Sequence, residues 1–170
     1  MHMKTIHFPF ALAALLLLAL SANAQTKYVV VEEGTGTWCQ WCPSGTAELH
    51  DLDIDYPEVI GIAVHNGDTM ELEAYDDASE FDAFPLGHID REYINQDVAT
   101  WEGHVQSQLA IAPPAAVNVS YNYNAVAGEV EVTIEAAFTQ SLTGNYRIAG
   151  VLIEDGVHGT SSDFDQSNSW

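Results

Sequence analysis

Two cysteines, Cys39 and Cys42, stand three positions apart where a strand-like segment gives way to a helix-like one. Residues 28–32 are β-branched and apolar, as in a buried strand. Residues 43–54 have helical apolar spacing that stops before Pro57. Two thiols this close at a helix start can form a disulfide without moving the backbone. The partial positive charge at the helix N-terminus favours a thiolate at Cys39, and a more buried Cys42 would resolve the mixed disulfide, so the pattern predicts a redox-active pair.

Two other interpretations of the motif stay open, a purely structural disulfide and a metal site. Zinc sites also use two cysteines at this spacing, but these are the chain's two cysteines, and His50 is the one histidine nearby. Cysteines alone therefore cannot fill a four-ligand zinc site. Trp38 directly before Cys39, together with the strand-then-helix context, favours the redox interpretation. We expect neither a metal nor a cofactor.

The N-terminus has the pattern of a secretory signal. Lys4 provides a positive charge, residues 11–20 are an unbroken apolar run, and residues 21–24 offer a small-x-small cleavage site. The apolar run is about half of the ~20 residues that a membrane-spanning helix needs. We therefore expect a signal peptide over residues 1–24. The mature chain would be exported without a membrane span, to the periplasm, to the outer membrane as an associated protein, or out of the cell.

The chain is strongly acidic, with 25 Asp and Glu residues against four Lys and Arg and a formal net charge of −21. Removal of the signal would also remove Lys4. Nucleic acids and anionic membranes are disfavoured as partners, because binding either requires Lys and Arg to displace counterions. A large net charge also opposes self-association, so we expect a monomer.

Alternating elements up to residue 110 predict an α/β layer with a partly parallel sheet. The expected strands are residues 28–32, 59–64 and 86–90, and the expected helices are residues 43–54, 71–81 and 97–109. After Pro113 and Pro114 the apolar period becomes two, with expected strands at residues 117–123, 130–136 and 148–153. We expect one domain over residues 25–112 and an antiparallel β module over residues 113–170. Three strands are few for a closed sandwich, which has about seven, so we expect a fragment of a longer protein.

Residues 30–43 read Val-Val-Glu-Glu-Gly-Thr-Gly-Thr-Trp-Cys-Gln-Trp-Cys-Pro and resemble the opening motif of the outer-membrane-protein-twenty-eight-related family. The resemblance covers roughly residues 28–110. It implies a thioredoxin-like three-layer domain, followed by the β module, in an exported protein of Gram-negative bacteria. Gly34 departs from the pattern, since an apolar residue is usual there. The last strand of a thioredoxin sheet is not evident between residues 92 and 97, so it is either missing or supplied by residues 115–123.

The resemblance also implies roles for residues around the cysteines. Glu33, six positions before Cys39, matches the buried acid that takes the proton of the resolving thiol, although a solvated carboxylate beside Glu32 is the alternative. Pro85 matches the cis-proline that faces the disulfide, and Phe84 before it suits a cis turn. The residues expected to contact a partner's disulfide are Trp38, Trp41 and Phe84.

Two functions follow as hypotheses. The first is an exported thiol–disulfide oxidoreductase that acts on protein thiols or disulfides. Gln40 and Trp41 replace the familiar Gly-Pro between the cysteines, so the direction of electron flow stays open. The alternative is a non-catalytic secreted or outer-membrane-associated binding protein, with a structural disulfide on a thioredoxin scaffold. Calcium binding by a group of acidic residues near the end of the sequence also stays open. These are Asp155, Asp163 and Asp165.

Overall fold

The computed structural model describes residues 25–168, so the expected signal peptide lies outside the described residues. The elements in chain order are β1 (Val29–Thr35), α2 (Pro43–Asp55), β2 (Val59–His65), α3 (Glu73–Ser79), β3 (Leu86–Ile89), β4 (Tyr93–Gln96), the 3-10 turn η2 (Val98–Thr100), α4 (Trp101–Leu109), β5 (Ala115–Asn124), β6 (Glu129–Phe138) and the 3-10 turn η3 (Ser162–Phe164). An α/β unit followed by an antiparallel hairpin confirms the predicted fold class. The domain boundary at residues 112 and 113 stays a prediction.

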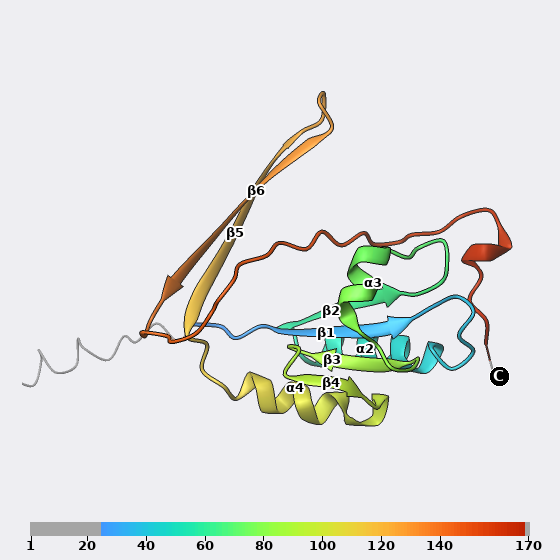
Figure 1. Cartoon of the computed structure of the whole chain (residues 1–170), viewed down its shortest axis with the longest axis horizontal. Helices are drawn as coiled ribbons and strands as arrows, with labels where there is room; N and C mark the ends of the chain where they lie inside the picture. Colours follow the sequence, from blue (N-terminus) through green and yellow to red (C-terminus); the bar gives the residue numbers. More distant parts are fainter. Residues whose placement is uncertain (1–24, 169–170) are drawn as a thin grey trace, which may run out of the picture.

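The first four strands form one mixed sheet in the order β2-β1-β3-β4. β1 runs parallel to β2 and antiparallel to β3, and β3 is antiparallel to β4. Helices α2 and α4 cover one face of the sheet and α3 lies on the other (Figure 1). The result is a three-layer arrangement with β1 inside the sheet, and the sheet is partly parallel, as the alternation of strands and helices predicts.

The apolar core lies between the sheet and the helices α2 and α4. Val29 and Val31 of β1 are fully buried there. The other buried members of this core are Leu52, Val59, Ile89, Trp101 and Val105. Gly87 in β3 leaves room for the large indole of Trp101, because a Cβ atom at position 87 would lie 2.4 Å from that ring. A glycine inside a strand often marks such a close approach.

The opposite face of β1 carries a buried carboxylate, Glu32, that is paired with the half-exposed Arg91. Glu32 is 2% exposed and accepts hydrogen bonds from Arg91 at 2.8 and 2.7 Å and from the Tyr75 hydroxyl at 2.5 Å. Burial alone would raise the pKa of Glu32, but the hydrogen bonds from Arg91 and Tyr75 and the positive charge of Arg91 lower it overall. The Arg91 guanidinium also lies over the Tyr75 ring, 5.5 Å from its centre. This network joins β1 to α3 and to the turn after β3.

The fourth strand corrects an expectation. A strand exists between residues 92 and 97, namely β4, and residues 115–123 do not supply it. The sequence hides this strand because it is short and polar, and because Asn95 has a positive φ of 52°. A tertiary contact anchors it instead: the Asn95 amide donates to Nδ1 of the buried His88 at 2.9 Å.

The expected third strand of the β module, residues 148–153, is also wrong. These residues belong to a segment without strand pairing, here called the strap (residues 146–168), which passes over the α3 side of the domain (Figure 1). Their β-branched composition favours an extended backbone but does not supply a pairing partner. The strap approaches β6 closely at one point, where a Cβ atom at Gly150 would lie 3.2 Å from Ile134.

The hairpin of β5 and β6 pairs ten residues on each strand. Val119 stands opposite Ile134 and Tyr121 opposite Val132, so the apolar side chains share one face, as the period of two predicts. Most of these side chains are exposed. Two helix bounds also differ from expectation, since α3 is shorter and a 3-10 turn precedes α4.

The ion pair on β1 yields a stability prediction. Arg91→Met removes the charged partner of buried Glu32, and we expect the free energy of unfolding at pH 7 to fall by about 2 kcal/mol. Urea denaturation measures this change. Because the pKa of Glu32 is lowered in the fold, the stabilisation is present above pH 4.5 and is lost as the pH falls further.

Arg147→Met is the matched control, because Arg147 is exposed on the strap. We expect it to change stability by less than about 0.5 kcal/mol. Equal effects of the two substitutions would contradict the assigned role of the Glu32–Arg91 pair.

Candidate functional site

The two cysteines form a disulfide in the turn between β1 and α2. Cys42 is the N-cap residue directly before α2, and Pro43 occupies the first helical position, where a missing N–H costs nothing. Cys42 is fully buried and Cys39 is 4% exposed. The loop that carries the pair (residues 36–42, here the cysteine loop) therefore places the disulfide at the N-terminal end of a helix, as the spacing predicts.

Residues just after β2 hold the cysteine loop in place. The Thr37 amide donates to Oδ2 of Asp68 at 2.8 Å, and the Trp38 indole donates to the Asn66 carbonyl at 2.6 Å. The same Asp68 carboxylate contacts His65 at 2.7 Å and accepts the Met70 amide. Burial would raise the pKa of Asp68, but these hydrogen bonds lower it overall, so the group anchors the loop as a carboxylate.

Sequence reasoning missed Asn66 and Asp68, although a signal existed. β1 and β2 are parallel, so the segments that follow them meet at one edge of the sheet, where sites in α/β proteins usually form. The polar residues after the second apolar run were therefore candidates for contact with the cysteine loop.

Glu33 lies on β1 beneath the first turn of α2 and is fully buried. The Thr46 hydroxyl lies 3.4 and 3.3 Å from its two carboxyl oxygens and 3.4 Å from the carbonyl oxygen of Cys42. Burial raises the pKa of Glu33 to about 8, and the Thr46 hydrogen bond opposes that rise without cancelling it. At neutral pH this carboxyl is therefore mostly protonated. It lies against Gly45 and Thr46, in the first turn of the helix that follows Cys42.

Gly45 and Pro85 complete the surroundings of Glu33. A Cβ atom at position 45 would lie 2.4 Å from Oε1 of Glu33 and 3.1 Å from Cβ of Pro85. The Phe84–Pro85 peptide bond is cis. The structure thus brings Glu33, Pro85 and the start of α2 together.

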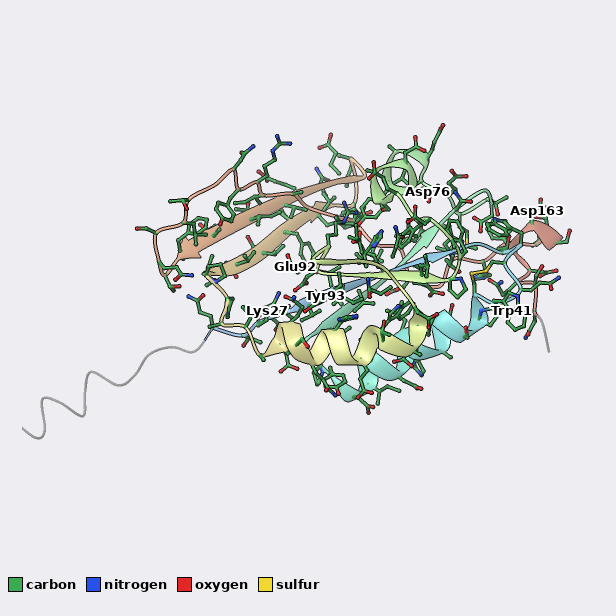
Figure 2. All side chains as sticks on the ribbon, turned by 60° about the horizontal axis from the view of Figure 1, so that its bottom comes forward. Lys27, Trp41, Asp76, Glu92, Tyr93 and Asp163 are labelled. Carbon is green, nitrogen blue, oxygen red and sulfur yellow. A yellow bond between two sulfur atoms is a disulfide. The ribbon has the colours of Figure 1, made fainter. Side chains whose placement is uncertain are left out.

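Aromatic side chains surround the cysteine loop. Trp38 packs edge-on against Phe84 with ring centres 5.4 Å apart, and Phe84 adjoins Phe81 at 6.1 Å. Trp38 is 48% and Trp41 64% exposed. Figure 2 shows Trp41 beside the start of α2, at the same end of the molecule as the disulfide.

The departure at Gly34 has a physical reason in this packing. A Cβ atom at that position would lie 2.7 Å from the Phe81 ring, which occupies the space a side chain would need. Phe81 in turn stacks on the buried His88, with ring centres 4.0 Å apart. An aromatic ring from outside the strand therefore fills the space beside Gly34.

The fold and site define a mixed α/β domain with a Cys39–Cys42 disulfide. Its marks are the mixed sheet, the disulfide at the start of the helix after β1, and the cis-proline directly before β3. Within the described residues there is no group of three or more His, Cys, Asp or Glu placed to hold a metal ion. None of the helices between residues 25 and 168 combines the length and hydropathy of a membrane span.

Comparisons with protein-family models and with curated proteins find no match to this chain. Among solved structures, HBP35 of Porphyromonas gingivalis is similar, with a TM-score of 0.47 and 22% sequence identity. The similarity covers 58% of this chain and 38% of that protein.

The close fit of Gly45 over Glu33 yields the second prediction. Gly45→Ala would push a methyl group into the Glu33 carboxyl, so we expect a loss of about 2 kcal/mol in unfolding free energy. Gly103→Ala is the matched control, since Gly103 is also helical and a Cβ atom there meets nothing within 4 Å. We expect that control to stabilise by up to about 1 kcal/mol, from helix propensity alone. Thermal or urea unfolding measures both, and a shared sign would contradict the assigned packing.

The raised pKa of Glu33 yields the third prediction. The folded chain binds this proton more tightly than the unfolded chain. The favourable contribution of the bound proton to the free energy of unfolding is therefore complete below pH 4.5 and is lost as the pH rises through about 8. Glu33→Gln removes this loss. Its stability relative to wild type should rise across that window, by on the order of 5 kcal/mol in total.

Denaturation curves at a series of pH values test the Glu33 prediction. Glu129→Gln, on an exposed position of β6, is the control and should follow the wild-type pH dependence. A constant difference between Glu33→Gln and wild type from pH 4.5 to 8 would contradict the prediction.

Proposed function

We propose that this chain is a thiol–disulfide oxidoreductase that exchanges the Cys39–Cys42 disulfide with thiols and disulfides of partner proteins. The observation that carries the proposal is the buried Glu33 carboxyl beneath the first turn of α2, directly after Cys42, with a pKa of about 8. A purely structural disulfide has no use for a proton donor held there. A buried acid with a pKa close to neutral is what a proton-transfer step requires.

The exchange starts from the disulfide form of the Cys39–Cys42 pair. A thiolate of a partner dithiol attacks Sγ of Cys39, the Cys39–Cys42 bond breaks, and Cys42 leaves as a thiolate that takes the proton of Glu33. The second partner thiolate then attacks the partner's own sulfur in the mixed disulfide and releases Cys39 as a thiolate. The pair has gained two electrons and the partner ends as a disulfide. In reverse, Glu33 accepts the Cys42 proton and Cys42 resolves the mixed disulfide.

The neighbouring residues have roles in binding. Pro85, close to Gly45 at the start of α2, would shape the edge that receives the partner's backbone. Trp38, Trp41 and Phe84 would present an apolar contact surface around the partner's sulfur atoms. Their exposure and mutual packing support this role.

A second candidate is a non-catalytic binding protein with a structural disulfide. The 4% exposure of Cys39 favours it, because an attacking sulfur must reach that atom. The hairpin of β5 and β6, which offers an exposed apolar face, also suits a binding protein. Export from the cytoplasm, and membership in the outer-membrane-protein-twenty-eight-related family, are part of the proposal for either function. They rest on the sequence of residues 1–24 and of residues 30–43.

Thiol trapping separates the two candidates. In Cys42→Ala the Cys39 thiol is free and the resolving cysteine is missing. We expect this variant to accumulate a mixed disulfide with insulin, while Cys39→Ala does not. Both variants should lose insulin reduction to the background rate. Non-reducing electrophoresis and a turbidity assay measure these outcomes. A wild-type reduction potential below about −300 mV together with no turnover would match a structural bond and overturn the proposal.

A further inference from the structure

Part of the strap lies on the cysteine loop, although 127 residues separate the contacting positions in the sequence. The Ser167 amide donates to the Thr37 carbonyl at 2.7 Å. The side-chain amide of Gln166 lies 2.8 Å from the Cys39 carbonyl and 3.3 Å from the Gly36 carbonyl. The strap thus occupies the row of carbonyls that the cysteine loop presents on both sides of Trp38.

A second contact ties the strap to the neighbouring loop. The Thr69 hydroxyl donates to the Asp163 carbonyl at 3.4 Å, just before the 3-10 turn η3 ends. Figure 2 shows Asp163 at the same end of the molecule as Trp41. The strap is therefore anchored to both loops that form the edge of the site, the cysteine loop and the segment after β2.

The rest of the strap is loosely packed. A hollow of about 880 Å³ lies between residues 151–157 and the side chains of β2, α2 and the segment before α3. Apolar residues of the strap remain largely exposed, among them Leu152 at 86%. A few hydrogen bonds, each with a small net free energy, therefore hold the strap on the cysteine loop. Such a contact can be released without unfolding the domain.

We propose that residues 161–168 are a removable cover of the exchange site, held by hydrogen bonds to the carbonyls of Gly36, Thr37 and Cys39 in the same chain. A partner gains access by displacing them. The partner segment that fits has an extended backbone with N–H groups for these carbonyls and carries its cysteines beside them. This inference rests on the proposed function and adds to it how the site is regulated. Cys39, whose carbonyl this segment contacts, is 4% exposed in a site that must meet a partner sulfur.

Point variants in the full chain test the cover. Gln166→Ala removes the side-chain donor, and Ser167→Pro removes the backbone N–H that reaches Thr37. The probe is a flexible synthetic peptide with two reduced cysteines, and the readout is the rate at which it reduces the Cys39–Cys42 disulfide. Losing one hydrogen bond should raise that rate about fivefold in each variant. Gln140→Ala, an exposed residue shortly after β6, is the control and should react like wild type.

The outcomes separate the cover from the proposed function. If wild type reacts with the peptide and both strap variants react at the same rate as wild type, the cover is overturned and the oxidoreductase stands. If no protein, variant or wild type, exchanges with the peptide, the oxidoreductase fails and the inference that rests on it fails too.

Hydrogen exchange of the Ser167 amide gives a second readout that does not need activity. We expect protection in wild type and in Gln140→Ala, and faster exchange in Gln166→Ala. An amide that exchanges in wild type at the rate of an unstructured peptide would overturn the cover.

Discussion

β1 is buried on both faces, yet it carries two consecutive carboxyl groups that must point to opposite sides of the sheet. The chain stabilises them in opposite ways. Glu32 meets the guanidinium of Arg91 on the α3 side, and its pKa falls. Glu33 meets the hydroxyl of Thr46 on the α2 side, and its pKa rises to about 8. One residue is thus an ion paired within the fold, and its neighbour is a buried carboxyl that holds its proton near neutral pH.

The chain has few cations that could pair with these two carboxyl groups. The whole sequence has four Lys and Arg against 25 acidic residues. Close to the sheet, Arg91 is paired with Glu32 and Lys27 with Asp90. Glu33 is buried without a cation beside it, so its carboxyl stays in the core at a lower free-energy cost when it is protonated. The acidic composition, which first served to disfavour nucleic-acid partners, therefore also bears on the chemistry of the site.

The sequence predicted the elements that local patterns encode. Apolar runs located β1 and β2, helical spacing and Pro43 located α2, and the cysteine spacing located the disulfide. β4 was missed because its stability comes from pairing with β3 and from the contact of Asn95 with His88. Residues 148–153 were predicted as a strand because their composition favours an extended backbone, but composition does not show whether another strand is there to pair with. Asp68 and Gln166 reach the cysteine loop across 31 and 127 residues, and short motifs do not encode such contacts.

The proposed exchange chemistry depends most on the protonation of Glu33. Carboxyl-carbon NMR of the disulfide form, with Glu33→Gln used to assign the signal, measures that titration directly. The account predicts a midpoint near pH 8 for Glu33. A midpoint near the ordinary value of 4.5 would contradict it, because Glu33 would then be an anion at neutral pH with no proton to give to Cys42.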